Sequence, residues 1–201
     1  MSRAPDPRTA RTRAAIISAT ELLLHTEGSN ASVAQIAKQA GVSVGSVYLH
    51  FGSKDELVEQ VILLAWERRT WEFDAAREAD RPLDRILAFG DAVVEFARTE
   101  PVAFRALRVR ALDPSATSSL TEDTLFADRL AELESDLAEV ASGAGTPPAT
   151  LAVLLLATWT GLAERLVRRD ALRVDPDLAT AVRHAAASVL TAGLAAPAAA
   201  L

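Results

Sequence analysis

The chain has 201 residues, of which half are apolar, a formal net charge of −6 and no cysteine. This length allows one or two domains with a buried core, and the lack of cysteine excludes disulfides and thiolate metal sites, as in a reducing cytoplasm. The N-terminal segment has no apolar run behind its charges, unlike a signal peptide. The apolar stretch Leu151–Trp159 is too short to span a bilayer, so we expect a cytoplasmic protein.

Basic charge is concentrated at the N-terminal end. Residues 1–54 contain six Lys and Arg against three Asp and Glu, whereas residues 55–201 contain fifteen against twenty-four. The net charge alone argues against a nucleic-acid ligand, but this distribution permits attraction to DNA at one end of the molecule.

Residues 1–8 contain two prolines and no periodicity, and we predict a disordered arm. Its arginines and those just beyond it either reach DNA phosphates and the minor groove, as basic arms do, or stay solvated: Arg3, Arg8, Arg11 and Arg13. A helix is predicted from Thr9 to His25, because apolar residues recur at helical spacing before Gly28 ends the pattern.

Two short helices are predicted on either side of Gly41. Ser32 with Gln35 forms a capping-box pattern for the first helix, and Ser43 can cap the second, Val44–Phe51. Gly41 lies where the chain must turn with positive φ, which glycine adopts most easily. This spacing predicts a helix-turn-helix, with Val44–Phe51 offered to the major groove.

An ordinary helical hairpin is the alternative, since capped helices joined by glycine are common. The second helix favours DNA binding because it carries hydrogen-bonding side chains and is followed by a lysine at the start of another helix. The residues expected to contact DNA are Ser32, Ser43, Val44, Gly45, Ser46, Tyr48, His50 and Lys54.

This stretch resembles the tetracycline-repressor (TetR) family over about residues 10–62. The matching residues are Gly28, Ser32-Val33, Ile36-Ala37, Ala40-Gly41-Val42-Ser43, Gly45-Ser46-Val47-Tyr48, His50-Phe51 and Ser53-Lys54-Asp55-Glu56-Leu57. The resemblance implies a DNA-binding domain over residues 9–54, a ligand-binding and dimerisation domain over residues 55–195, and a tail over residues 196–201. It also implies a repressor that binds an inverted-repeat operator as a homodimer.

Within the reading helix, Val44 is suited to a thymine methyl group, and Ser46 to a base or a phosphate. Tyr48, His50 and Lys54 are suited to the phosphate backbone. Ser46 replaces the threonine that is frequent in the family, and Gly45 leaves few side chains to read bases.

Beyond residue 54 every periodic segment is helical, and no strand pattern or internal repeat occurs. We therefore predict an all-α fold of about nine helices. The later predicted helices begin at Asp55 and near Ile86, and then cover Pro101–Leu112, Thr121–Ala141, Ala149–Asp170 and Pro176–Leu194.

If the resemblance extends to the domain over residues 55–195, the body of the protein, an apolar pocket there should bind a small hydrophobic or aromatic effector. The candidate lining residues are Trp66, Phe89, Val93, Phe104, Leu107, Phe126, Leu130 and Trp159, with Arg105, Arg108 or Thr158 as polar anchors. For each of them the alternative is a place in the core.

The last two predicted helices are rich in apolar and small residues, and we expect them to form a two-fold dimer interface. The candidate interface residues are Leu155, Leu162, Leu178, Val182, Ala186, Val189, Leu190 and Gly193. The alternative is that both helices fill the core of a single chain.

No catalytic, cofactor or metal signature is present: the three histidines are isolated, and no nucleophile elbow, zinc-protease motif or phosphate loop occurs. We predict no catalytic residue, no metal and no cofactor. Two alternatives to a ligand-responsive regulator remain: a DNA-binding protein without an effector, and a helical-bundle enzyme.

Overall fold

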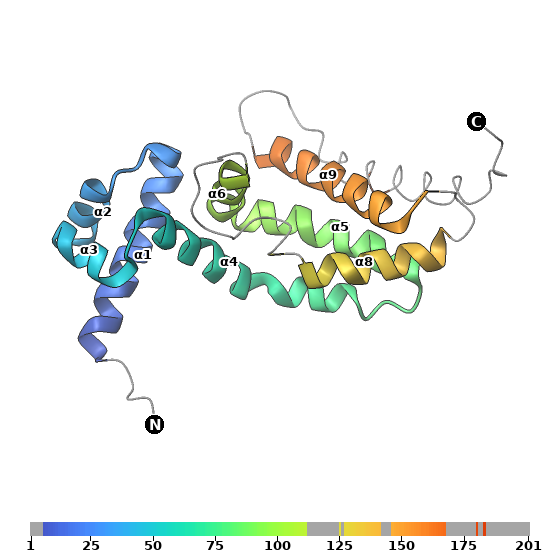
Figure 1. The fold of residues 1–201 in the computed structure, drawn as a ribbon, viewed down its shortest axis with the longest axis horizontal. Helices are drawn as coiled ribbons and strands as arrows, with labels where there is room; N and C mark the ends of the chain where they lie inside the picture. The colour runs from blue at the N-terminus through green and yellow to red at the C-terminus, as the bar shows by residue number, and fades with distance from the viewer. Residues whose placement is uncertain are drawn as a thin grey trace. The chain divides into compact units, whose positions relative to one another are not determined.

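The computed structural model describes residues 6–111, 125, 127–141, 146–167, 180 and 183. Within them the chain forms eight α-helices, one short 3-10 helix and no strand (Figure 1). The predicted all-α class is therefore confirmed, while the last predicted helix, residues 176–194, lies almost wholly outside the described residues. The elements are α1 (Pro7–Glu27), η1 (Gly28–Asn30), α2 (Val33–Ala40), α3 (Val44–Phe51), α4 (Lys54–Ala76), α5 (Pro82–Thr99), α6 (Pro101–Ala111), α8 (Ala127–Val140) and α9 (Pro148–Val167).

Two compact units divide the chain. One contains Met1–Glu67 with Val102–Glu122, and the other contains Arg68–Pro101 with Asp123–Leu201. In this division the first half of α4 belongs with the N-terminal helices, and the domain boundary expected at residues 54 and 55 stays a prediction. Leu57 of α4 is fully buried in their core, so the helix cannot be separated from them at its first residue.

Helix α1 begins earlier than predicted. The Asp6 side chain accepts the Arg8 backbone N–H at 2.9 Å, and Pro7 occupies the first turn, where its missing N–H costs nothing. Residues 7 and 8 are therefore helical, which corrects the arm predicted over residues 1–8. Gly28, with φ of 62°, ends the helix after Glu27.

The predicted helix-turn-helix is confirmed. Ser32 caps α2 through a reciprocal capping box, with its hydroxyl accepting the Gln35 N–H at 3.2 Å and Gln35 Oε1 accepting the Ser32 N–H at 2.8 Å. Gly41 adopts the left-handed conformation with φ of 70°, and the Val42 N–H bonds the Ala37 carbonyl at 2.9 Å. Helices α1 to α4 share one apolar core, made of Ile16, Ala19, Ile36, Ala37, Val47, Phe51 and Leu57.

In the second unit, α5, α8 and α9 pack against one another (Figure 1). The Phe89 ring lies 5.6 Å from the Phe73 ring and 5.7 Å from the Trp159 ring, measured between centroids. Trp159 fits because Gly90 faces it: a Cβ atom added at Gly90 would overlap the indole. The aromatic contact thus depends on a residue without a side chain.

Replacing Gly90 with alanine should lower the free energy of unfolding by about 1–3 kcal/mol, because the added methyl group would overlap the buried Trp159 indole and force it out of its place. Helix propensity alone predicts the opposite sign, a gain of up to about 1 kcal/mol. Denaturant unfolding in the wild type and in a Trp159→Leu background measures the difference. An equal cost in both backgrounds would show that the indole is not the cause.

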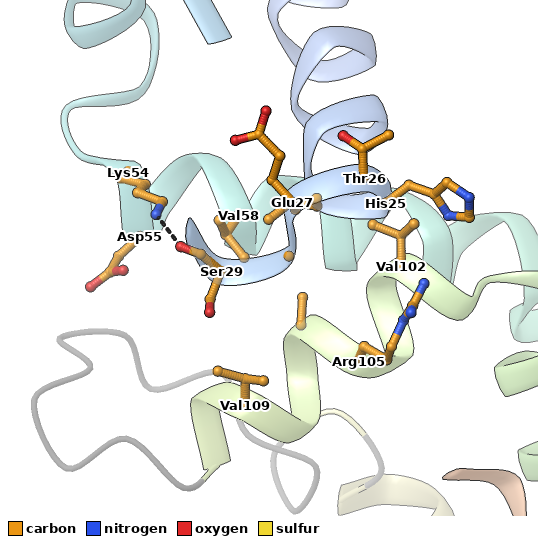
Figure 2. Close-up of a pocket in the computed structure, with 13 residues that line it drawn as sticks. His25, Thr26, Glu27, Ser29, Lys54, Asp55, Val58, Val102, Arg105 and Val109 are labelled. Carbon is orange, nitrogen blue, oxygen red and sulfur yellow. Dashed lines mark hydrogen bonds between the residues drawn. The ribbon is translucent and has the colours of Figure 1, made fainter. Parts of the chain in front are cut away.

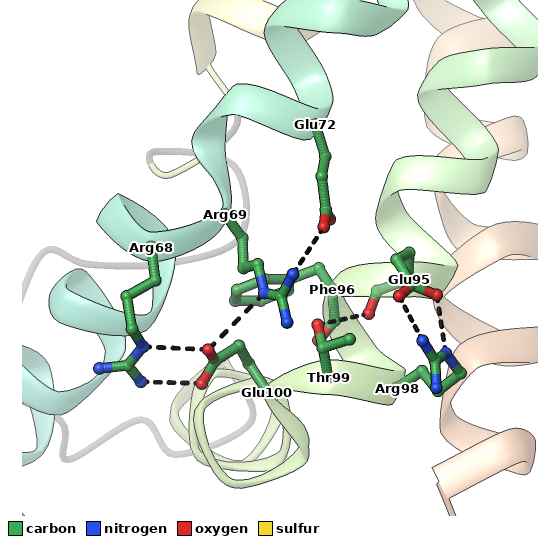
Figure 3. A network of polar contacts seen from close by, with 8 residues as sticks. All are labelled: Arg68, Arg69, Glu72, Glu95, Phe96, Arg98, Thr99 and Glu100. Carbon is green, nitrogen blue, oxygen red and sulfur yellow. Dashed lines mark hydrogen bonds and ion pairs between the residues drawn. The ribbon is translucent and has the colours of Figure 1, made fainter.

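A polar network joins the second half of α4 to the end of α5 (Figure 3). Arg68 donates to both Glu100 carboxylate oxygens at 3.0 and 2.8 Å, and Arg69 lies 3.9 Å from Glu100 and 2.9 Å from Glu72. On α5 itself, the hydrogen bond from Arg98 lowers the pKa of Glu95. Ion pairs with one solvent-exposed partner add little stability, but the bidentate geometry fixes the end of α5 against the second half of α4.

None of the helices in the described ranges is long and apolar enough to cross a membrane.

Candidate nucleic-acid interface and effector site

Helix α3 is anchored on one face and open on the other. Val47 and Phe51 are 2% and 4% exposed and lie in the apolar core shared by α1 to α4, the helices that form the head. Ser43 caps the helix by accepting the Ser46 N–H at 3.1 Å. These contacts fix the rotation of the helix about its axis. The opposite face is therefore presented to solvent in a defined orientation.

The open face carries three exposed large side chains. Val44 is 41% exposed, Tyr48 is 48% and Leu49 is 85%. Gly45 lies beside them, and nothing in the free protein requires glycine there, since its φ is not positive and an added Cβ would meet only Ser43 Oγ at 3.8 Å. An exposed apolar surface on a rigid helix, with bare backbone at its first turn, is suited to close approach to base edges.

Leu49 was missed by the sequence reasoning. It lies between the hydrogen-bonding residues Tyr48 and His50 and off the buried Val47–Phe51 stripe, which is the signal that places it on the open face. Its side chain can contact thymine methyl groups, as was proposed for Val44.

The predicted phosphate contacts have partners of their own in the free protein. The Ser32 hydroxyl donates to Gln35 Oε1 at 2.6 Å while also capping α2, and His50 is half-buried. The Lys54 ammonium donates to the Ser29 carbonyl at 2.8 Å. Ser53 caps α4 by accepting the Glu56 N–H at 3.1 Å, and the helix begins at Lys54, one residue before the predicted start.

Arg13 stabilises the end of α3. Its guanidinium donates to the His50 carbonyl at 3.3 Å and to Gln60 Oε1 at 2.5 Å, and it lies 4.5 Å from the centroid of the Phe51 ring. From the sequence, Arg13 is one of four arginines expected either to reach DNA or to stay solvated. The structure instead gives it a positioning role between α1, α3 and α4.

Replacing Arg13 with methionine should lower the free energy of unfolding by about 1–2 kcal/mol, since two charge-assisted hydrogen bonds and a cation–π contact are lost. Arg11→Met is the matched control, because Arg11 is exposed, and its effect should stay within about 0.5 kcal/mol. Denaturant unfolding of both variants decides the role. If the Arg13→Met protein kept its stability but bound DNA more weakly, the result would instead support a phosphate contact by Arg13.

Comparison with known proteins agrees with this geometry. The family model described as bacterial regulatory proteins, tetR family, matches residues 16–61. An uncharacterised HTH-type transcriptional regulator of Haemophilus influenzae is 50% identical over 46 residues, which is 22% of this chain and 25% of the relative. Over residues 16–61 the chain is therefore similar to the TetR family. The match spans only a quarter of that relative's length.

Solved structures of similar fold cover nearly the whole chain. A protein described as a transcriptional regulator from Pseudomonas aeruginosa PAO1 superposes with a TM-score of 0.72 at 25% identity, covering 94% of each chain. AibR, solved in complex with isovaleryl coenzyme A and operator DNA, gives a TM-score of 0.67 at 14% identity and covers 87% of this chain and 97% of its own. At such identity the second likeness concerns the fold alone.

The residues predicted to line a TetR-type effector pocket fall into both units. Phe104 and Leu107 are buried on α6 and Trp66 is half-buried on α4, in the first unit; Phe89, Val93 and Trp159 are buried in the second, where Leu130 is half-buried. Phe126 lies outside the described residues. Residues that fill the core would be buried in the same way as residues that line a pocket, so the effector pocket stays a prediction.

The cavities of the described residues involve few of these positions. One cavity, of about 530 Å³, lies in the first unit and is lined by Arg105, one of the predicted polar anchors. A second, about 200 Å³, lies in the other unit beside Trp159 and Gly90, and a third, about 20 Å³, beside Phe89. Arg108 is half-buried and Thr158 donates its hydroxyl to the Leu154 carbonyl at 2.8 Å.

Two of the predicted dimer-interface residues are described. Leu155 is half-buried, but Leu162 is 7% exposed and buried by its own chain, so its side chain offers no surface to a partner. The apolar side chains that α9 exposes are instead Val153 at 65% and Leu154 at 58%. The remaining candidates lie outside the described residues: Leu178, Val182, Ala186, Val189, Leu190 and Gly193.

Among the described residues, no three His, Asp or Glu side chains lie together as a metal site requires.

Proposed function

We propose that this protein is a DNA-binding transcriptional regulator of the TetR family, a repressor that binds an inverted-repeat operator as a homodimer and is released by a small effector. The observation that carries the proposal is the state of α3. Its buried residues, Val47 and Phe51, hold it rigidly, while Tyr48 and Leu49 are exposed on the opposite face. A sequence-reading helix needs this combination.

Phosphate contacts would come from the ends of the neighbouring helices. The Ser43 hydroxyl, which accepts one N–H as a cap, retains its proton for a phosphate oxygen. Lys54 lies in the first turn of α4, where its charge and the helix dipole both attract phosphate. These contacts would position α3, and the side chains of α3 would select the sequence.

A two-fold partner is supported by α9. Val153 and Leu154 are adjacent, large, apolar and more than half exposed, which is unusual for a surface with no partner. A homodimer formed through this face would present two copies of α3, as an inverted repeat requires. Proteins of the family usually bind operators as dimers.

The link from an effector to DNA is supported by α4. The helix begins at Lys54 in the first unit and ends at Ala76 in the second, where Arg68 and Arg69 are paired with Glu100. An effector that changes the α5–α6 corner would therefore change the preferred position of α4. AibR, a protein of similar fold, is described with both a coenzyme A ester and operator DNA.

Fluorescence anisotropy of a labelled duplex from the DNA adjoining the gene tests the proposal, because such regulators often control neighbouring genes. We expect binding that saturates, exceeds that of a scrambled duplex, and weakens steeply with salt as counterions are released. Equal binding to both duplexes would leave only non-specific attraction and contradict a regulator that reads sequence.

An effector that dissociates the complex should itself bind less tightly in the presence of operator, by the same factor by which it weakens DNA binding. That factor should be about 5- to 150-fold, the usual range of coupling between sites. Quenching of tryptophan fluorescence, measured with and without operator, gives both affinities. An apolar ligand that fills the body and leaves DNA affinity unchanged would favour a DNA-binding protein without an effector.

A further inference from the structure

A cavity of the described residues lies where α1 ends, α4 begins and α6 passes, within the first unit (Figure 2). Its volume of about 530 Å³ falls within the range of small-molecule sites, ~300–1,000 Å³. One part of its lining is apolar, with Leu24, Val58, Val102, Ala106 and Val109. It is separate from the residues predicted to form the effector pocket, apart from Arg105.

The polar part of the lining includes two cations, Lys54 and Arg105, and two carboxylates, Glu27 and Asp55. Glu27 is occupied by a hydrogen bond from Gln35 Nε2 at 2.6 Å, and Figure 2 shows its carboxylate turned away from Val109. Asp55 and Arg105 both have interactions within the protein. Among the described residues the Lys54 ammonium has a single hydrogen-bond partner, the neutral Ser29 carbonyl at 2.8 Å, so no carboxylate salt bridge neutralises its charge.

From this cavity we propose a second ligand site, which binds a small amphipathic anion. The apolar body of the ligand packs on Val58, Val102 and Val109, and its anionic head accepts a hydrogen bond from the Lys54 ammonium. A charged acceptor in place of a backbone carbonyl gives the shorter and stronger hydrogen bond. The three valines come from α4 and α6, so one molecule contacts both helices.

Occupancy of this site should compete with operator DNA, because Lys54 serves both ligands. This part of the inference rests on the proposed function, whereas binding of the anion does not. The competition is direct, at a shared ammonium group, and needs no change in the second unit. It is therefore a different mechanism from the effector coupling through α4.

Anilinonaphthalene sulfonate is a suitable probe, since it joins an aromatic body to one anionic group and fluoresces when it leaves water. Its neutral relative N-phenylnaphthylamine lacks the sulfonate. The chain has two lysines, Lys54 in the cavity and Lys38 on α2, so acetylation followed by mass spectrometry locates the probe. At ten times the dissociation constant, acetylation of Lys54 should slow by roughly tenfold, with that of Lys38 unchanged.

Lys54→Met should weaken binding of the sulfonate by about tenfold, because a charge-assisted hydrogen bond is lost, and should change the affinity of the neutral relative by less than about twofold. Lys38→Met is the matched control and should change neither affinity. Ala106→Phe, with Val109→Phe as a second variant on the exposed rim, should reduce binding of both probes by filling the cavity. Circular dichroism identifies any variant that fails to fold.

Equal acetylation of the two lysines at saturating sulfonate would overturn the site, as would unchanged affinity in both cavity-filling variants. The DNA measurement is separate. If the sulfonate protects Lys54 and leaves DNA affinity unchanged, the competition is overturned and the site stands. A protein that binds no DNA but protects Lys54 would contradict the proposed function alone.

Discussion

Replacing Tyr48 with alanine should lower the affinity for operator DNA by roughly ten- to a hundredfold while leaving the free energy of unfolding unchanged. The side chain is 48% exposed on the open face of α3 and makes no contribution to the head core. Its ring and hydroxyl are therefore available for the sugar–phosphate backbone. The loss should fall almost entirely on the complex, and anisotropy titration against operator and scrambled duplexes measures it.

Leu22→Ala is the control for this result. Leu22 is similarly exposed, at 47%, but lies on α1 rather than on α3, and its loss should leave DNA affinity within about twofold of the wild type. A Tyr48→Ala protein that binds operator like the wild type would contradict the assignment of α3 as the reading helix.

Replacing Phe51 with alanine should have the largest effect on stability, lowering the free energy of unfolding by about 3–5 kcal/mol. Phe51 is 4% exposed in the core shared by α1 to α4, and the Arg13 guanidinium packs on its ring. Such a loss is a large share of the total stability of a small domain. DNA binding should disappear because the head unfolds, which circular dichroism and denaturant unfolding detect.

Leu49→Ala, two residues earlier on the same helix, is the contrasting substitution. Leu49 is 85% exposed, so truncation should change stability by less than about 0.5 kcal/mol and still weaken operator binding. If Leu49→Ala destabilised the protein as much as Phe51→Ala, the inward and outward faces of α3 would be wrongly assigned.

The parts of the site that the sequence predicted correctly are those set by local chemistry. Ser32, Gly41 and Ser43 cap or turn the chain through contacts within a few residues of themselves. Ile36 and Val47 are the apolar residues that the crossing of the two short helices would bury, and both are buried. Residue type and spacing are sufficient for such features, since no distant part of the chain takes part in them.

The features that the sequence did not predict depend on partners far along the chain. Arg13 bonds residues 37 and 47 positions away, and Lys54 bonds a carbonyl 25 positions away. The sequence around Arg13 or Lys54 contains no pattern that indicates these distant partners, so the expected role of each side chain followed from its charge alone. The contact of Gly90 with Trp159 is likewise visible only once α5 and α9 are packed.

The effector pocket shows a different limit. Apolar residues at helical spacing are predicted to be buried, and Phe89, Val93 and Trp159 are indeed buried. Residues of the core and residues that line a cavity share this spacing, so the pattern does not distinguish them. The cavity at the α1–α4–α6 junction instead combines apolar residues with Lys54 and Arg105 from separate segments. Such a mixed lining forms only in three dimensions.

Selection of a random-sequence duplex library on the purified protein, followed by sequencing of the retained DNA, tests the central claim most directly. The account predicts enrichment of an inverted repeat whose half-site centres lie about one helical turn, ~34 Å, or a multiple of it apart, as two copies of α3 require. The same selection on the Tyr48→Ala protein should enrich it poorly or not at all. Retained DNA with no sequence in common, at low as well as moderate salt, would contradict a dimeric regulator that reads DNA through α3.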